Sequence, residues 1–492
     1  MICRNSENGL CLRHLRFTFL GAFILGVFGA NLSAAEAFDP RPWLEDLDQA
    51  RSAFTTKYAD LEWEVFARGL DISAIFRQTR ERVQQAGGVD DAKAAFNDLA
   101  KQFGDRHVGF RWPESQTSLR ERAGLDCANL GYSKQMQAAP LATLVPGFIP
   151  LSPLPSKEFP AGILRVEGHK LGVVKIRLFS PRAFPDLCEE AISALQIDRA
   201  KVCDDSCRDG VDLWSSVAMT QNLEATLAAV KAVGAEYLLV DVAGNGGGSQ
   251  WAEAAARMLT TARLKSTPMY FMKGEHWTKK LAKSEGELRR AAIDAHDEDR
   301  EFLSTLADSV ATHKKEAEKL CDGEALWSGK HPACVWLGDG FYSTGILQSA
   351  DSDKLRSKPW AKIVFTPMQY PYREGIWRGP LMILVDGGTG SAAEQFAAEL
   401  QDNRAAVIIG SLTVGAGCGH TDGGTPTTLK NTGAILELPD CVRMRPGGLN
   451  LASGVQPDIL VGLQGEDSPQ RRASLLSTKL GEAVKLAGKP TH

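Results

Sequence analysis

Runs of apolar residues in the second half of the chain predict buried strands that alternate with helices. Four stretches are continuously apolar, as in strands that are covered on both faces of a parallel sheet: 172–178, 236–242, 381–386 and 405–410. Three stretches between them have the apolar spacing of helices: 223–233, 251–259 and 391–400. This alternation, with right-handed crossovers, predicts an α/β fold in which helices flank a parallel-rich sheet.

The other segments differ from this core in composition. Apolar residues at helical spacing predict a mostly helical domain over 38–112, whereas six closely spaced prolines predict loops and short strands over 113–168. The α/β core then covers 169–470. At about 262–378 it is interrupted by a charged helical insertion, which we interpret as a solvated surface element. We interpret residues 471–492 as a C-terminal tail.

The N-terminus has the pattern of an export signal. Arg13 and Arg16 precede an apolar segment that ends in small residues, and both 33–35 and 35–37 fit a small-x-small cleavage site. We therefore predict a signal peptide over 1–37 and a periplasmic or extracellular protein. No later stretch is apolar for long enough to span a bilayer, so no stable membrane span is expected after cleavage.

Composition narrows the function classes. The formal net charge is −4, which argues against a nucleic-acid partner, and 43% hydrophobic residues suffice for a real core. Eight cysteines follow the signal segment, and an even number in an oxidising compartment suggests disulfides. Sequence does not fix their connectivity, but the pairs suggested are Cys203–Cys207, Cys321–Cys334, Cys418–Cys441 and, by remainder, Cys127–Cys188.

The only metal-like cysteine spacing is Cys203-x-x-x-Cys207. No histidine or further cysteine cluster completes a site there, so the structural interpretation is favoured. We predict no metal and no organic cofactor.

The turn DGGTGS, residues 386–391, joins a predicted strand to a helix and places Ser391 at the helix start. A serine there is either a helix cap or a nucleophile. A second glycine loop, 244–248, follows another predicted strand, so both loops should share one edge of the sheet. Backbone amides there are suited to bind an oxyanion. A phosphate loop is disfavoured because the Gly-Lys-Ser/Thr ending is absent.

One histidine has a suggestive setting. His107 lies in FGDRHVGF, between a helical segment and an apolar stretch. A lone histidine is more often structural than catalytic. The sequence alone does not link it to Ser391.

Six stretches taken together carry a family resemblance: GDRH, VVKIRLFS, VDVAGNGGG, DGGTGSAAE, GSLTVGAG and GVQPDI. In order and spacing the set resembles the tail-specific (C-terminal processing) and tricorn-core serine protease superfamily over most of 40–465. The resemblance implies a ClpP/crotonase-like core preceded by a helical region. It also implies Ser391 as the nucleophile, in a small-x-Ser-Ala-x-Glu motif, and oxyanion donors at Gly246 or Gly247 together with Ala392.

The sequence departs from this superfamily at the general base. Tail-specific members have a lysine where this chain has Ala416, so a Ser–Lys dyad is not expected. The tricorn-like branch uses a histidine in an Asp-x-His motif, and His107 matches it, which places the chain nearer to the histidine-base branch. His420, four residues after the missing lysine, is a rival base.

Two further departures concern the third catalytic residue and the middle region. The glutamate that orients the histidine in the tricorn-like branch is absent, and Asn450 is the candidate to replace it. Residues 113–168 are short for the PDZ domain that tail-specific proteases usually carry, so we expect a reduced or absent one.

These observations predict an exported serine endopeptidase that acts on protein or peptide substrates. One alternative is a catalytically weak or inactive binding protein on the protease fold. A less favoured alternative is an esterase or amidase. The sequence makes no prediction of oligomeric state.

Overall fold

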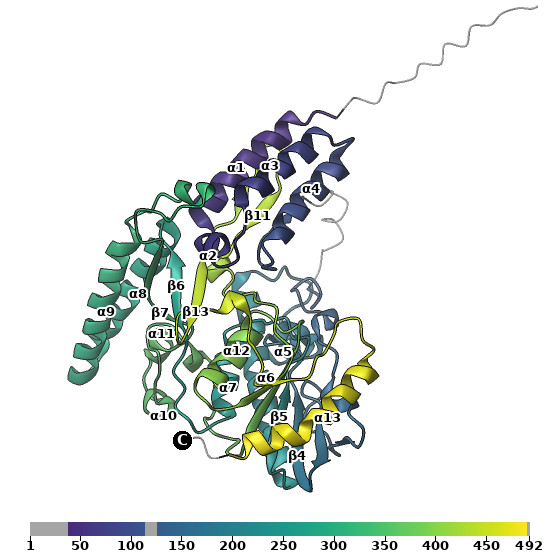
Figure 1. Ribbon diagram of the computed structural model, residues 1–492. Helices are drawn as coiled ribbons and strands as arrows, with labels where there is room; N and C mark the ends of the chain where they lie inside the picture. The colour runs from purple at the N-terminus through teal and green to yellow at the C-terminus, as the bar shows by residue number, and fades with distance from the viewer. Residues whose placement is uncertain (1–37, 114–124, 490–492) are drawn as a thin grey trace, which may run out of the picture.

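The computed structural model describes residues 38–113 and 125–489 (Figure 1). The predicted signal peptide, 1–37, lies outside the described residues. Within the described part of the chain, no helix combines the length and the apolar character needed to cross a bilayer.

The centre of the fold is a seven-stranded sheet in the order β14-β9-β8-β5-β4-β3-β2. The four neighbouring pairs from β14 to β4 are parallel, and β3 pairs antiparallel with β4 and β2. The strands are β2 (Ile149–Pro150), β3 (Ala161–Val166), β4 (His169–Lys175), β5 (Tyr237–Asp241), β8 (Leu381–Val385), β9 (Val407–Gly410) and β14 (Ile459–Leu460). The four apolar runs thus form adjacent strands, as predicted, and the parallel-rich α/β fold is confirmed.

Helices cover both faces of this sheet, which explains why its central strands are mainly apolar. One face packs on α5 (Pro185–Ala194), α6 (Asp205–Ala232), α7 (Trp251–Met258) and α12 (Ala392–Asp402). The other face packs on α13 (Pro469–Ala487), which crosses β4 and β5 in Figure 1. This C-terminal helix was not predicted from the sequence, where the segment was interpreted as a tail.

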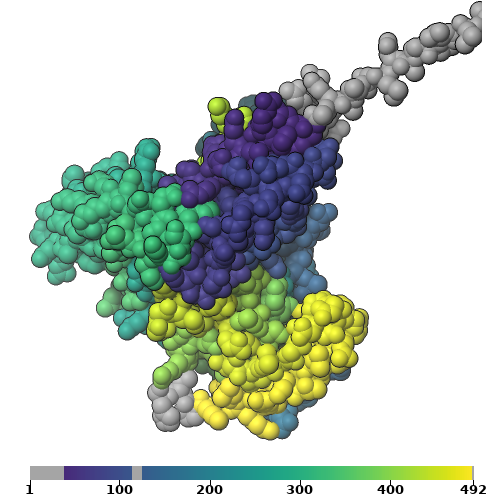
Figure 2. All heavy atoms as spheres, turned by 45° about the horizontal axis from the view of Figure 1, so that its top comes forward, coloured from purple at the N-terminus to yellow at the C-terminus, as the bar shows by residue number. Residues whose placement is uncertain are grey.

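The N-terminal region is a helical layer completed by a small sheet. Its helices are α1 (Arg41–Lys57), α2 (Leu61–Phe66), α3 (Ile72–Gln84) and α4 (Val89–Gln102). The sheet, ordered β1-β11-β10, joins β1 (Gly109–Arg111) to β10 (Thr427–Thr428) and β11 (Ile435–Glu437) from near the other end of the chain. Leu436 therefore shares one core with Phe54 and Phe96. In Figure 2 this purple and blue region lies against the C-terminal half, drawn in green and yellow.

The predicted insertion contains the expected charged helices and also strands that were not predicted. Its elements are β6 (Pro268–Met272), α8 (Glu275–Asp294), α9 (Asp297–Ala317), β7 (Leu337–Tyr342), α10 (Ser352–Leu355) and α11 (Ala361–Val364). β6 and β7 form a sheet with β12 (Cys441–Arg445) and β13 (Leu449–Asn450), in the order β13-β12-β6-β7. This sheet anchors the α8–α9 hairpin beside the core.

Four disulfides form, and all four suggested pairings are confirmed: Cys127–Cys188, Cys203–Cys207, Cys321–Cys334 and Cys418–Cys441. The last one fastens the segment after β9 to β12.

Candidate active site

Ser391 occupies a strained position directly before helix α12. Its backbone φ is +52° and its ψ is −123°, a conformation that costs a non-glycine residue about 1–3 kcal/mol. Its amide donates a 2.9 Å hydrogen bond to the carboxylate of Glu394, which helps to hold this geometry. The side chain is only partly buried. Strain of this kind concentrates at functional sites, where the fold sustains it.

The two glycine loops meet at one edge of the sheet, as predicted. Asp386 Oδ1 accepts hydrogen bonds from the amides of Gly388, at 2.9 Å, and Gly244, at 2.6 Å. The amide of Gly390 also donates to the carbonyl of Asn245 at 2.9 Å. The loop after β5 is therefore fastened to the turn that carries Ser391.

Gly247 lies so close to Ser391 that only glycine fits. Its φ is +111°, and a Cβ there would lie 2.7 Å from Ser391 Cβ and 2.9 Å from the Ala392 nitrogen. The Gly247 amide itself donates to Asn245 Oδ1 at 2.9 Å. The amides of Gly246 and Ala392 have no hydrogen-bond acceptor among the described residues. Of the three predicted oxyanion donors, these two therefore have backbone N–H groups that can donate to a substrate.

Glu394 fixes the turn that carries Ser391 through hydrogen bonds to its carboxylate. Its buried carboxylate accepts hydrogen bonds from Thr413 Oγ1 at 2.5 Å and from the amides of Gly415 at 2.5 Å and Ala416 at 2.8 Å, besides that of Ser391. Burial raises the pKa of Glu394, while these four donors oppose the rise. Glu394 thereby holds the segment after β9 against the serine turn.

His107 is paired with a carboxylate, Asp105, that was not among the site residues predicted from the sequence. Its Nδ1 lies 2.9 Å from Asp105 Oδ1, which also accepts the His107 amide at 2.8 Å. Asp105 is buried and the imidazole is 21% exposed. Because Nδ1–H donates to the carboxylate, Nε2 is free to accept a proton. The signal for Asp105 was its place two residues before the histidine in GDRH, the Asp-x-His motif.

The segment after β9 connects the serine turn to this histidine. Val414 donates its amide to the carbonyl of Thr389 at 3.0 Å, beside Ser391. Five residues later, Gly419 lies against the imidazole, where an added Cβ would approach His107 Nε2 to 3.2 Å. The structure thus brings the three remote stretches to one region of the molecule.

His420, the rival base, lies next to His107. The ring centroids are 5.7 Å apart at an interplanar angle of 82°. His420 Nε2 is buried and has no hydrogen-bond partner among the described residues. Burial and the neighbouring His107 lower the pKa of His420, so its imidazole stays neutral near pH 7.

Asn450 does not contact an imidazole. Its Nδ2 donates to Asp60 Oδ1 at 2.7 Å, and its Oδ1 accepts the Ala452 amide at 2.9 Å. Asp105 instead occupies the position on His107 that was expected for Asn450. Among the described residues, no group of three or more histidine, cysteine or acidic side chains is arranged to hold a metal.

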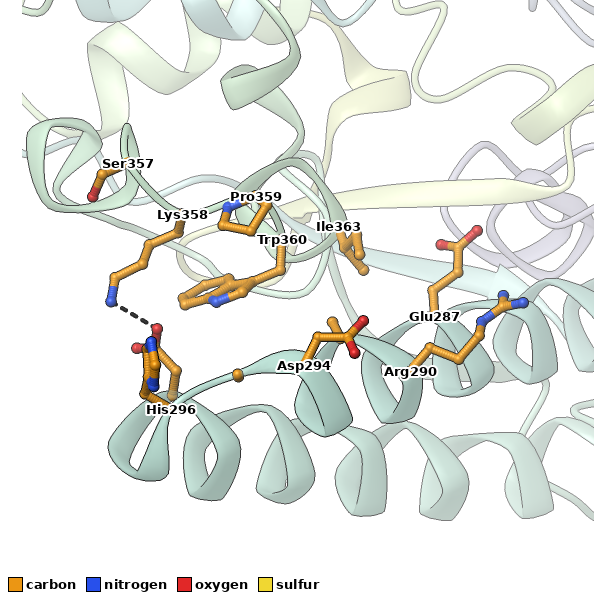
Figure 3. Close-up of a pocket in the computed structure, with 12 residues that line it drawn as sticks. Glu287, Arg290, Asp294, His296, Ser357, Lys358, Pro359, Trp360 and Ile363 are labelled. Atoms are coloured by element: carbon orange, nitrogen blue, oxygen red, sulfur yellow. Dashed lines mark hydrogen bonds and ion pairs between the residues drawn. The ribbon is translucent and has the colours of Figure 1, made fainter.

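One cavity adjoins this site and a larger one lies apart from it. A cavity of about 340 Å³ lies between the N-terminal helices and the site, with Asp105, Val414 and Gly415 among its lining residues. A larger one, of about 600 Å³, lies between the α8–α9 hairpin and Trp360 and includes the Lys358–Asp299 ion pair (Figure 3). Because none of its lining residues belongs to the glycine loops or the histidine pair, it is separate from the candidate site.

The α/β core and the two glycine loops that meet at Ser391 define the class of the protein: it has the fold and the glycine turns of a serine peptidase. The sequence matches Peptidase family S41 over residues 209–461, more than half of the chain. The chain belongs to this family.

A curated relative and two solved structures extend this comparison. Over 83 residues the chain is 37% identical to a carboxy-terminal-processing protease of Bartonella bacilliformis, a stretch that is 17% of this chain and 18% of that protein. The structure of mature CPAF complexed with lactacystin is similar with a TM-score of 0.57 and 14% identity, over 91% of this chain and 99% of that one. Mature CPAF alone gives a TM-score of 0.56 at 14% identity, over 91% and 98%. At this identity the two structures show the shared fold.

Proposed function

We propose that the protein is an exported serine endopeptidase of the histidine-base type. Ser391 is the nucleophile, His107 the general base, and Asp105 the carboxylate that orients His107. The observation that carries the proposal is the convergence of the Asp105–His107 pair and the Ser391 turn on one segment, Val414–Gly419. A lysine base is disfavoured because its position is Ala416, whose side chain has no titratable group.

The proposed reaction begins with attack of Ser391 Oγ on a peptide carbonyl carbon, while the hydroxyl proton passes to His107 Nε2. The amides of Ala392 and Gly246 donate to the oxygen that becomes negative. His107 then gives its proton to the departing amine, leaving an acyl-enzyme. Water, deprotonated by the same imidazole, hydrolyses the ester and restores the serine.

Export is the second part of the proposal. The predicted signal segment 1–37 and four disulfides fit an oxidising compartment, either periplasmic or extracellular. The relative from Bartonella bacilliformis is named for processing carboxy termini, which supports protein chains as substrates.

The decisive variant is Ser391→Ala. It should abolish hydrolysis of an unfolded protein substrate and of short peptides, with an unchanged far-UV circular dichroism spectrum. Full activity in this variant would overturn the assignment. Faster wild-type turnover of short esters than of peptides would favour an esterase instead.

A further inference from the structure

Three buried carboxylates lie close enough to one another for their charges to interact, and one of them, Asp105, is paired with His107. Asp60 is the N-cap residue of α2, Glu64 lies within α2, and Asp105 lies in the segment after α4. Tyr58 contacts the same cluster, since its hydroxyl donates to Glu64 at 3.1 Å. Only Asp105 belongs to the mechanism proposed above, so the role of the other two is open.

The three acids differ in their cationic partners. Glu64 forms a 2.5 Å ion pair with Arg68, and Asp105 faces His107 at 2.9 Å. Asp60 has no cation within ion-pair distance among the described residues; its one side-chain donor is the Asn450 amide. The second oxygen of Asp60 is buried without a hydrogen-bond partner, as is that of Asp105.

An unpaired buried anion beside two other carboxylates is costly, and protonation removes the cost. Burial raises the pKa of Asp60 to about 8; the Asn450 hydrogen bond opposes this rise, and the charges of Asp105 and Glu64 add to it. Burial also raises the pKa of Glu64 to about 7, against the attraction of Arg68. Asp60, the carboxyl group without a cation, therefore keeps its proton to a higher pH than Glu64 does.

Asp60 is also linked to the serine turn by a path of contacts. The Asn450 side chain that it holds accepts the amide of Ala452 at 2.9 Å. The Ala452 carbonyl lies against Gly415, only 2.3 Å from where a Cβ would stand. Gly415 in turn donates to Glu394, the residue that holds the Ser391 amide.

We propose that Asp60 is a positioning residue of the peptidase site: as a neutral acid it anchors Asn450 and leaves Asp105 as the anion that faces His107. The proposal rests on the proposed function. It gives the N-terminal helical region a part in the site. Ionisation of Asp60 would place a second uncompensated anion beside Asp105 and disturb both contacts, so activity should decline on the alkaline side as Asp60 loses its proton.

The test compares pH profiles of kcat/KM for the wild type, Asp60→Asn, Asp60→Ala and a control, Asp46→Asn. Asparagine imitates the neutral acid and can still accept from Asn450, whereas alanine cannot. Asp46 is an equally buried aspartate of α1 that binds the backbone of Asn431 and Thr432, away from the cluster. The wild type and Asp46→Asn should lose about tenfold in kcat/KM between pH 7 and pH 9.

Asp60→Asn should lose less than about twofold over the same range, and Asp60→Ala should lie about tenfold below Asp60→Asn at pH 7. An alkaline decline in Asp60→Asn as steep as in the wild type would overturn the proposal. So would equal damage by asparagine and alanine.

Stability provides a readout that does not depend on activity. Because the pKa of Asp60 is higher in the folded state than in the unfolded chain, the wild type loses stability relative to Asp60→Asn as pH rises from about 4 to about 8. Above that the difference is constant. A difference in Tm that does not change with pH would show that Asp60 is ionised in the fold. An inactive wild type that still shows this trend would contradict the proposed function but not the protonation of Asp60.

Discussion

The amide of Ala416 donates a 2.8 Å hydrogen bond to the carboxylate of Glu394, the third residue after Ser391. Tail-specific proteases, which this chain resembles, have their lysine base at the position of Ala416. Here the side chain at that position is a methyl group that is 2% exposed, and only its backbone takes part in the site. This segment lies beside Ser391, the proposed nucleophile, and the proposed base comes from the N-terminal region.

Glu394→Gln should damage the site without removing any group from the proposed chemistry. The carboxylate accepts four hydrogen bonds, and an amide would direct a donor at other donors. We expect a loss of about 2–3 kcal/mol in the free energy of unfolding, measured by urea denaturation, and a lower kcat. Wild-type values for both would contradict this role of Glu394.

Ser391→Gly should make the protein more stable while inactivating it. Glycine adopts a φ of +52° without the steric cost that serine bears, although it loses more conformational entropy on folding. The net gain should be about 1 kcal/mol, seen as a higher Tm than that of Ser391→Ala. A lower Tm for the glycine variant would show that the position is not strained.

Gly247→Ala should abolish activity, because its methyl group would overlap the Ser391 side chain and the Ala392 amide. Peptide turnover by purified, folded protein measures this effect. The matched control is Gly286→Ala, in the middle of α8, where an added Cβ meets nothing within 4 Å. An active Gly247→Ala variant would rule out an oxyanion pocket at this place.

Asp105→Asn should reduce kcat by about 10³–10⁴-fold while changing KM little. The amide cannot accept from both the backbone and Nδ1 of His107 as the carboxylate does, and it does not stabilise an imidazolium. Steady-state kinetics on a peptide substrate provide the measurement. A fall smaller than tenfold would mean that Asp105 only shapes the turn.

Loss of the Cys418–Cys441 disulfide should impair both stability and activity. Gly419 forms a β-bridge with Cys441 and lies against His107. The disulfide therefore holds the backbone that forms one wall of the site. The double serine variant should lose about 3 kcal/mol and most of its activity. The corresponding change at Cys203 and Cys207 is the control, since that bond lies in another core cluster. Equal activity of the two double variants would contradict the proposed wall.

The main sheet could be predicted from the sequence because parallel strands buried on both faces are apolar along their whole length. The shared edge of the two glycine loops followed from the direction of those strands. The strands of the small sheets could not be predicted in this way. β1 and β11 have three residues each, too few to show a period, and they pair across most of the chain.

The hydrogen-bond partners of the polar side chains at the site were not predicted from the sequence. Asp105 lies in a polar turn, where an aspartate is common for local reasons. Asp60 could not be selected because its hydrogen-bond donor, Asn450, is 390 positions away in the sequence. Asn450 was expected to orient an imidazole, but its hydrogen-bond partner is the acid Asp60. Pairings of this kind depend on tertiary packing, which a single sequence does not display.

The most direct measurement is the rate at which a fluorophosphonate probe modifies Ser391 at pH 8, followed by peptide mass spectrometry in the wild type, His107→Gln and His420→Gln. We expect one adduct, on Ser391, forming at similar rates in the wild type and His420→Gln. In His107→Gln it should form at least about 100-fold more slowly. No adduct in the wild type, or unchanged labelling of His107→Gln, would contradict a site built from Ser391 and His107.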